Sequence, residues 1–258
     1  MFDYDYSPMS ALASVSALKI DRFAAFSALK TELAARAEAA RESTAERCFA
    51  SGLPALDAVL GGGLLRGTLV ALEGSSGRTA IAARLLARAT ATGLAAAIDT
   101  GELFPPALAR AGVRLDRLLV VPATTALGIA RAVDILLRSR AFAVVLMPAV
   151  ALRGQVWARL AGLAQKAGAI VLALGTAGAE LCAFAATRVR CALDRVLIAG
   201  ANGVFTRLIG YDVRAQVLKH RFGRPGGEAV VRAMHRSGGA PVRERILARV
   251  ALRAVGMV

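Results

Sequence analysis

The sequence predicts an α/β fold: a parallel sheet flanked by helices, with antiparallel strands at one edge and helical segments at both ends. Between residues 67 and 177, short apolar runs alternate with longer segments of helical periodicity, which is the pattern of parallel strands joined by crossover helices. After Thr187 the apolar runs follow one another with turns between them, which is typical of antiparallel strands. We therefore expect an N-terminal helical segment (1–45), a core (46–235) and a C-terminal helical tail (236–258).

The N-terminal segment has the periodicity of an amphipathic helix. Leu12, Val15 and Leu18 are spaced three apart, and Leu29 and Leu33 continue an apolar stripe. Two interpretations of this stripe are open: it packs on a core of its own, or it docks on a neighbouring subunit. In the second case Leu29 and Leu33 are the residues that we expect to contact the partner.

The core is expected to alternate between helices and strands. Glycine and proline mark many of the breaks, as in the Gly61-Gly62-Gly63 run, and short apolar runs lie between the helical segments. Helices are expected at residues 54–60, 78–92, 105–112, 125–139 and 153–168, and strands at 67–72, 95–100, 117–123, 143–149 and 169–177.

The C-terminal tail carries a second apolar stripe. Val242, Ile246 and Val250 lie on one face of a predicted helix that is otherwise rich in arginine. An apolar ridge flanked by charges suits insertion into a groove of a partner protein. It suits covering the edge of the sheet equally well, so both interpretations stay open.

Composition restricts the class of protein. The 258 residues are 56% hydrophobic, enough for a sizeable core, yet no apolar run reaches the ~18 residues that cross a bilayer. The start, MFDYDYSP, is acidic where a signal peptide would be basic, so we expect a soluble cytoplasmic protein that binds no membrane. Cys48, Cys182 and Cys191 are too few and too scattered for a disulfide framework or a zinc site, so we expect buried thiols and no metal.

The net charge of +15 comes almost entirely from arginine. A strongly basic surface attracts polyanions and acidic partners. No motif that reads DNA or RNA accompanies this charge, and a GC-rich bacterial genome would also favour arginine and alanine. Contact with nucleic acid is therefore one open interpretation of the charge.

Residues 71–86, ALEGSSGRTAIAARLL, carry the candidate chemistry. An apolar strand leads into a glycine-rich turn and a helical pattern follows, which is the context of a phosphate-binding loop. That motif has four residues between its glycines and a lysine after the second one. Here only two residues separate the glycines, and an arginine takes the place of the lysine. The candidate nucleotide-binding residues are Gly74, Ser75, Ser76, Gly77, Arg78 and Thr79.

The longer stretch FASGLPALDAVLGGGLLRGTLVALEGSSGRTAIAARLL (residues 49–86) resembles the opening of the RecA-like recombinase core. The resemblance continues through IDTGELFPPALARAGVRLDRLLVV and, more weakly, through TRLIGYDVRAQVLKHRF. It covers roughly residues 48–235. It implies that the predicted fold is RecA-like and that the chain has the family's nucleotide site. The four functional groups of that site can each be compared with the residue at the matching position of this sequence.

The loop and the catalytic carboxylate of that site are altered. Arg78 replaces the lysine, and the loop is either short or has Leu72 at its first glycine position, while Thr79 keeps the position that holds magnesium. By the resemblance, the glutamate that activates water falls on Gly101, with Glu102 one residue further on.

The remaining two groups are altered as well. The acidic residue that ends the next strand and helps to hold magnesium falls on Pro148, and the polar sensor falls at Gly175 and Thr176. Positioning and electrostatics are nearly the whole of phosphoryl-transfer catalysis. We therefore predict a pseudo-ATPase without catalytic residues and without a required cofactor, for which weak ATP binding stays open.

The connections that bind DNA in the recombinases are short in this sequence. Arg153, Arg188 and Arg190 lie where we expect these shortened loops. They are candidates for contact with the DNA backbone, although we favour their interpretation as solvated surface arginines.

Among RecA-like proteins, a degenerate, arginine-rich chain with helical segments at both ends is similar to the ImuA group, inactive relatives of RecA and SulA. That resemblance implies a nucleoid-associated bacterial adaptor in the SOS response to DNA damage, active in translesion synthesis and mutagenesis. The implied partners are ImuB, RecA, an error-prone DNA polymerase reached through ImuB, and DNA; a homo-oligomer is also open. Two alternatives are a DNA-stimulated ATPase that uses Glu102 and Arg78, and a SulA-like cell-division inhibitor.

Overall fold

The computed structural model describes residues 30–32, 47–199, 207–221, 223 and 225–234. The chain divides into two units between Arg47 and Cys48, and in the first unit only a helical turn at residues 30–32 and Arg47 are described. The predicted segment boundaries at residues 45 and 235 stay predictions. The predicted docking residues, which are Leu29, Leu33, Val242, Ile246 and Val250, lie outside the described residues.

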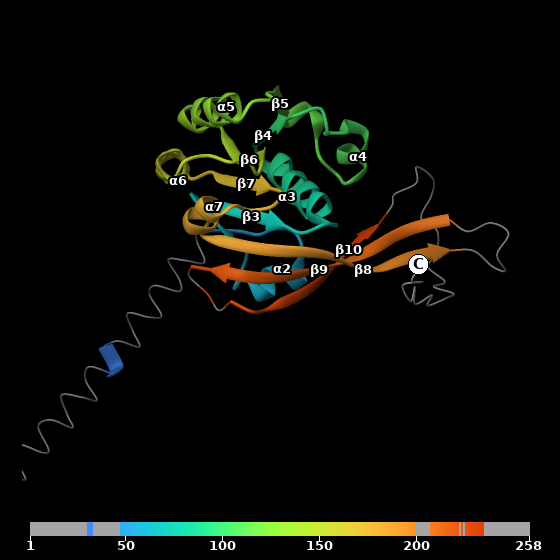
Figure 1. Ribbon diagram of the computed structural model, residues 1–258. Helices are drawn as coiled ribbons and strands as arrows, with labels where there is room; N and C mark the ends of the chain where they lie inside the picture. Colours follow the sequence, from blue (N-terminus) through green and yellow to red (C-terminus); the bar gives the residue numbers. More distant parts are fainter. Residues whose placement is uncertain (1–29, 33–46, 200–206, 222, 224, 235–258) are drawn as a thin grey trace, which may run out of the picture. The chain divides into compact units, whose positions relative to one another are not determined.

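The second unit is built on an eight-stranded mixed sheet (Figure 1). Its strands are β3 (Leu69–Glu73), β4 (Leu94–Asp99), β5 (Leu118–Pro122), β6 (Phe142–Pro148), β7 (Ile170–Leu174), β8 (Thr187–Ala199), β9 (Arg207–His220) and β10 (Glu228–Met234). They lie in the order β10-β9-β8-β3-β7-β6-β4-β5. The six strands from β8 to β5 run parallel, and β9 and β10 continue the sheet as antiparallel strands, which confirms the predicted fold class.

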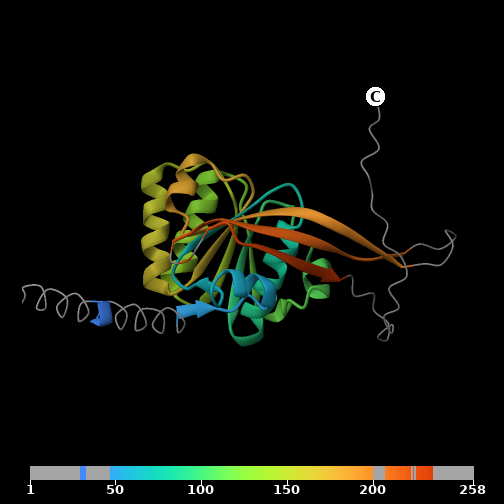
Figure 2. The same cartoon turned by 90° about the horizontal axis from the view of Figure 1, so that it is seen from below.

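Helices cover both faces of this sheet (Figure 2). One face carries α2 (Pro54–Val59), α3 (Arg78–Thr92) and α4 (Pro105–Arg110), and the other carries α5 (Ala126–Ser139), α6 (Gly154–Ala167) and α7 (Ala179–Phe184). Because successive strand residues point to opposite faces, Val70 and Leu72 of β3 enter the first core while Leu69 and Ala71 enter the second. The strand therefore reads as one continuous apolar run.

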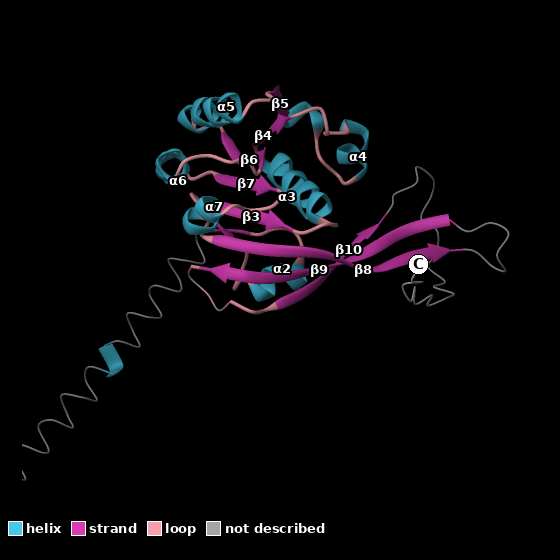
Figure 3. Ribbon diagram, in the orientation of Figure 1, coloured by secondary structure: helices cyan, strands magenta, loops and turns pink. Residues whose placement is uncertain are grey.

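The predicted helices and strands agree with the observed ones to within a few residues (Figure 3). The prediction missed a small antiparallel sheet of β1 (Cys48–Phe49) and β2 (Leu64–Leu65), whose two-residue strands are too short for a periodic signal. It also missed α7, which lacks the proline that marks the start of the equally short α2 and α4. It also extended β7 too far, since the strand ends at Leu174 and Gly175 follows at φ 140°. No helix in the described ranges is long and apolar enough to pass through a membrane.

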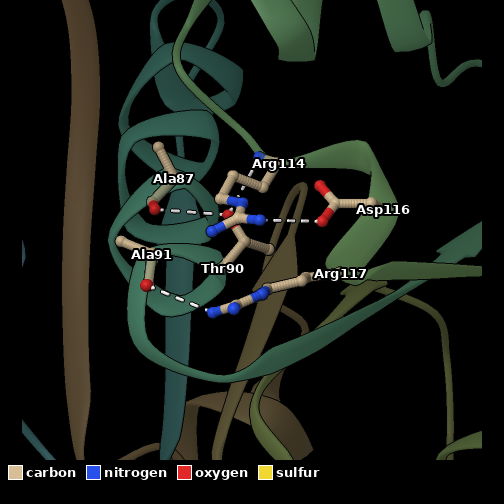
Figure 4. Close-up of polar contacts among 6 residues, drawn as sticks. All are labelled: Ala87, Thr90, Ala91, Arg114, Asp116 and Arg117. Carbon is tan, nitrogen blue, oxygen red and sulfur yellow. Dashed lines mark hydrogen bonds and ion pairs between the residues drawn. The ribbon is translucent and has the colours of Figure 1, made fainter.

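The C-terminal end of α3 holds the segment that follows α4 (Figure 4). The buried hydroxyl of Thr90 donates to the carbonyl of Leu86 at 2.8 Å and accepts the backbone N–H of Arg114 at 3.1 Å. Arg117, in the 3-10 turn Leu115–Arg117, donates to the carbonyl of Ala91 at 3.3 Å. These bonds fix α4 alongside α3, because they anchor the chain immediately after it.

The antiparallel strands extend beyond the parallel part of the sheet. Strand β8 pairs with β3 only between Thr187 and Arg190, and the rest of β8 continues with β9 as a long ribbon (Figures 1 and 2). Cross-strand ion pairs stabilise the ribbon: Arg214 to Asp194 at 2.6 Å and Arg232 to Asp212 at 2.8 Å.

Candidate functional site

The candidate site lies at the carboxyl edge of the parallel strands, where ligands bind in open α/β sheets. Neighbouring strands β3, β7, β6 and β4 end there at Glu73, Leu174, Pro148 and Asp99. Pairing of Leu174 with both Leu72 and Pro148 aligns three of these ends. The positions that the sequence singled out, Pro148 and the residues that follow the other three ends (74–79, 101–102 and 175–176), therefore all lie at this edge.

The loop between β3 and α3 is short. Leu72 lies inside β3, is 1% exposed, and pairs with Leu174 on one side and Val189 on the other. The strand continues through Glu73, which leaves only residues 74–77 before the helix begins at Arg78. The structure thus has Leu72 in the strand and a loop of four residues, and the choice between the two alignments that the sequence left open stays a prediction.

Both glycines of this loop are required by close packing against strands β8 and β9. Gly74 has φ 112° and Gly77 has φ 84°, in the region that favours glycine. A Cβ on Gly74 would overlap the backbone carbonyl of Cys191 in β8, and one on Gly77 would overlap the side chain of Val213 in β9. The glycines therefore have a packing role in this chain, whatever the loop binds.

Arg78 turns back onto its own loop. Its guanidinium Nη1 donates a hydrogen bond to the carbonyl oxygen of Gly74, at the start of the loop. Ser75 and Thr79 are exposed beside it, and Ser76 is half-buried. The cation that stands in the lysine position is thus bound by the loop itself.

A partly buried ion pair lies next to this loop. Nε of Arg188 lies 2.6 Å from Oε1 of Glu73, whose residue is 9% exposed, and the hydrogen bond to Glu73 raises the pKa of Arg188. Arg188 and Arg190 lie within β8, which corrects the expectation that they occupy a loop. Arg153 is exposed at the N-cap of α6, and Arg190 is exposed as well.

Sequence reasoning did not assign a role to Glu73. Its signal was present, because an acidic residue that ends an apolar strand needs a partner when it is buried. The partner, Arg188, is 115 residues further along the chain, which no local pattern indicates.

Asp99, at the end of β4, organises the turn that follows. Its Oδ1 accepts the backbone N–H groups of Gly101 at 2.8 Å and of Glu102 and Leu103 at 3.0 Å. These bonds, above all the one from Leu103, hold the pKa of Asp99 below its usual value. Glu102, which the alternative ATPase reading requires, is exposed on this turn.

Backbone contacts join the ends of β6, β7 and β3. The N–H of Ala149, immediately after Pro148, donates to the carbonyl of Leu174 at 2.7 Å, and the N–H of Gly175 donates to that of Leu72 at 3.1 Å. Within the part of the chain that the structure describes, no group of three His, Cys, Asp or Glu residues is placed to hold a metal ion. Thr176 is exposed next to this junction.

The three cysteines differ in burial, which partly corrects the expectation. Cys191 is 1% exposed, and burial raises the pKa of its thiol to about 12. Cys48 and Cys182 are only half-buried. Burial also raises the pKa of Cys48.

A second candidate surface lies at the far edge of the sheet, on β5. This strand pairs only with β4 among the described strands, and it presents Leu119 at 46% and Val120 at 39% exposure. On α5, Leu127 and Ile135 are 58% and 68% exposed. The sequence predicted a strand covered on both faces, because an apolar run does not show whether its strand lies inside or at the edge of a sheet.

Comparisons with known proteins agree with this geometry. Residues 57–180 match the family described as the MT3502 N-terminal domain. The chain is 38% identical to RecA of Nostoc punctiforme over 107 residues and 41% identical to RecA of Mycobacterium ulcerans over 106 residues. These matches cover 40% and 39% of this chain and 30% and 31% of the RecA proteins, so the chain matches less than a third of their length.

The fold has a counterpart among solved structures. A crystal structure of the RadB recombinase superposes with a TM-score of 0.56 and 20% sequence identity, over 71% of this chain and 94% of that one. This likeness confirms the RecA-like α/β fold. Together with the RecA matches it supports a RecA-like superfamily relationship.

Proposed function

We propose that this RecA-like chain is a non-catalytic adaptor of the bacterial DNA-damage response. Like the ImuA group, it supports error-prone translesion synthesis together with ImuB and an error-prone DNA polymerase, and it contacts RecA or DNA. One observation carries the non-catalytic part of the proposal: the guanidinium of Arg78 is bonded to the Gly74 carbonyl of its own shortened loop.

Phosphoryl transfer needs a cation that reaches the transferred group and carboxylates that hold magnesium and orient water. Here the cation has an internal acceptor, and the strand end that should carry the acidic residue is Pro148. Two carboxylates at this edge of the sheet are also engaged, Glu73 with Arg188 and Asp99 with backbone N–H groups. These contacts support a site that is retained as part of the fold.

The adaptor part of the proposal is supported by the edge strand β5. Soluble proteins usually protect a sheet edge with charges, prolines or a covering segment, because an unpaired apolar edge invites another strand. In β5 only the final Pro122 provides such protection, and Leu119 and Val120 are exposed. A RecA-like partner or ImuB would add a strand or an apolar face here, alongside the predicted docking stripes of the two termini.

The catalytic part is tested by phosphate release from ATP with Mg²⁺, with and without single-stranded DNA, with RecA as positive control. We expect release equal to the protein-free blank under every condition. DNA-stimulated release that is lost in Arg78→Ala and Glu102→Gln would instead establish the alternative ATPase. A parallel titration with a fluorescent ATP analogue measures whether nucleotide binds without turnover.

The adaptor part is tested by pull-down of ImuB and of RecA. The double variant Leu119→Lys/Val120→Lys should lose binding, whereas Val230→Lys, at 50% exposure on the opposite edge strand β10, should keep it. Deletion of residues 1–45 or 237–258 tests the two terminal stripes. Unchanged binding in all these variants refutes the docking surfaces, and inhibition of a tubulin-like filament would favour the cell-division alternative.

A further inference from the structure

We propose that the cleft between α3, α4 and the β9–β10 hairpin is a binding site for an acidic peptide segment of a partner protein. The cleft encloses about 490 Å³. Its lining includes Arg84 of α3, Arg110 of α4 and Arg232 of β10, and it reaches Thr79 of the candidate nucleotide-binding residues. No Asp or Glu occurs among the described residues that line it, and Asp212 is bonded to Arg232 beside it. The proposal does not depend on the translesion role.

The floor of the cleft is made of small apolar side chains. Ala80 and Ala83 come from α3, Ala107 and Leu108 from α4, and Ala233 from β10. Methyl groups leave room for a short aliphatic side chain of a ligand, whose burial contributes the hydrophobic part of binding. The helices that provide this floor are fixed side by side by the Thr90 and Arg117 hydrogen bonds of Figure 4.

Two of the three arginines are held in place before a ligand arrives. The carboxylate of Asp212, which is 3% exposed, accepts from Nε of Arg232 at 2.8 Å and from its Nη2 at 3.2 Å. The guanidinium of Arg110 lies over the ring of Phe104, 5.9 Å from its centroid. A side chain ordered in this way loses less conformational entropy when it binds, and the guanidinium fork of Arg110 matches a carboxylate in a bidentate manner. The Nε–Nη2 edge of Arg232 is already occupied by Asp212, so Arg232 helps to shape the wall of the cleft.

The arrangement favours an acidic peptide over a nucleotide or single-stranded nucleic acid. Arg84 and Arg110 come from two different helices that line the cleft, so two carboxylates spaced along an extended peptide can each meet one of them, whereas Arg232 is already paired with Asp212. Tyr211 is the single aromatic residue of the lining and is half-buried, so the lining offers no pair of rings to sandwich a base.

The test is an array of short synthetic peptides that carry two acidic residues around one valine or leucine, probed with the intact protein. A matched array has lysine at the acidic positions. We expect retention on the acidic array only, and affinity for the best peptide at least about tenfold weaker in Arg84→Ala/Arg110→Ala. The variant Arg84→Lys/Arg110→Lys keeps both positive charges without the guanidinium forks. Its affinity for the best peptide should lie between those of the unchanged protein and of Arg84→Ala/Arg110→Ala.

Two controls separate the cleft from the general charge of the protein. Arg131→Ala removes an exposed arginine of α5, on the other face of the sheet, and should leave peptide affinity unchanged. Ala107→Glu places a negative charge in the cleft and should weaken the binding of acidic peptides. This variant tests the cleft independently, in case Arg84→Ala/Arg110→Ala does not fold. Three results would each overturn the proposal. Lysine peptides could be retained as well as acidic ones, or the double variant could bind the best peptide with unchanged affinity. The third is that ATP or an oligonucleotide binds in the cleft while no acidic peptide is retained.

Discussion

The loop after β3 and the edge strand β5 differ in what their side chains contact: those at the loop are bonded within the chain, and those on the edge strand are exposed. At the loop, Arg78 is bonded to Gly74 and Arg188 to Glu73, and strands β8 and β9 pack against the two glycines. At the edge, Leu119 and Val120 are exposed on a strand that pairs on one side only.

This difference is the reverse of what a phosphoryl-transfer enzyme requires. An enzyme of that kind leaves the polar groups of the loop free for its ligand and protects its sheet edges from other chains. Here the internal contacts lie at the loop and the exposed apolar surface lies at the edge. This contrast is the one that the proposed non-catalytic adaptor requires, and four predictions test it.

The largest effect is expected for Gly74→Ala. The added Cβ overlaps the Cys191 carbonyl at a backbone angle of φ 112°, so the free energy of unfolding should fall by about 3 kcal/mol or more. Urea denaturation measures it. Gly162→Ala in α6, where no atom lies near the new Cβ, is the matched control and should stabilise by up to about 1 kcal/mol. An unchanged free energy of unfolding in Gly74→Ala would mean that Gly74 is not packed against the Cys191 carbonyl.

The next effect is expected when the ion pair beside the loop is broken. Glu73→Ala leaves the Arg188 guanidinium, at 23% side-chain exposure, without its carboxylate and should cost about 2 kcal/mol of unfolding free energy. Denaturation in urea again provides the measurement. Arg114→Ala, which removes the well-exposed pair with Asp116, is the control and should change stability very little. Equal costs for both pairs would contradict the inferred burial of the first.

A smaller effect depends on pH. The backbone N–H groups at Asp99 hold its pKa in the folded protein below the ordinary value of 3.8, so this carboxylate stabilises the fold above that value. The contribution is lost as pH falls through the folded pKa. Asp99→Asn should therefore lower the thermal midpoint at neutral pH and reduce its decline in acid. Parallel acid profiles of the two proteins would show that the turn does not need the charge.

The smallest effect on stability is expected at the open edge. Leu119→Lys should change the free energy of unfolding by no more than about 0.5 kcal/mol, because the side chain is already 46% exposed. The same variant should reduce any self-association seen by sedimentation velocity, while Val230→Lys on β10 should not. A large loss of stability in Leu119→Lys would mean that β5 is part of the core.

Local patterns predicted the order of the elements well. Helix α3 begins where Gly77 precedes a run of helix formers, and the continuous apolar run of β3 indicated a strand buried on both faces. The same patterns located the altered groups, since Arg78 and Pro148 are visible in the sequence alone. They did not indicate α7, which has no proline at its start, whereas the equally short α2 and α4 begin with one.

The sequence by itself determined the α/β fold class and which residues occupy the strand ends of the candidate site, because apolar periodicity and turn residues act over a few neighbouring positions. Tertiary structure decided what those residues contact. Glu73 meets Arg188, Gly74 meets Cys191, and three arginines from separate elements surround one cleft, all through contacts between distant parts of the chain. Only the strand order placed β5 at an edge, which turned an apolar run into an exposed surface.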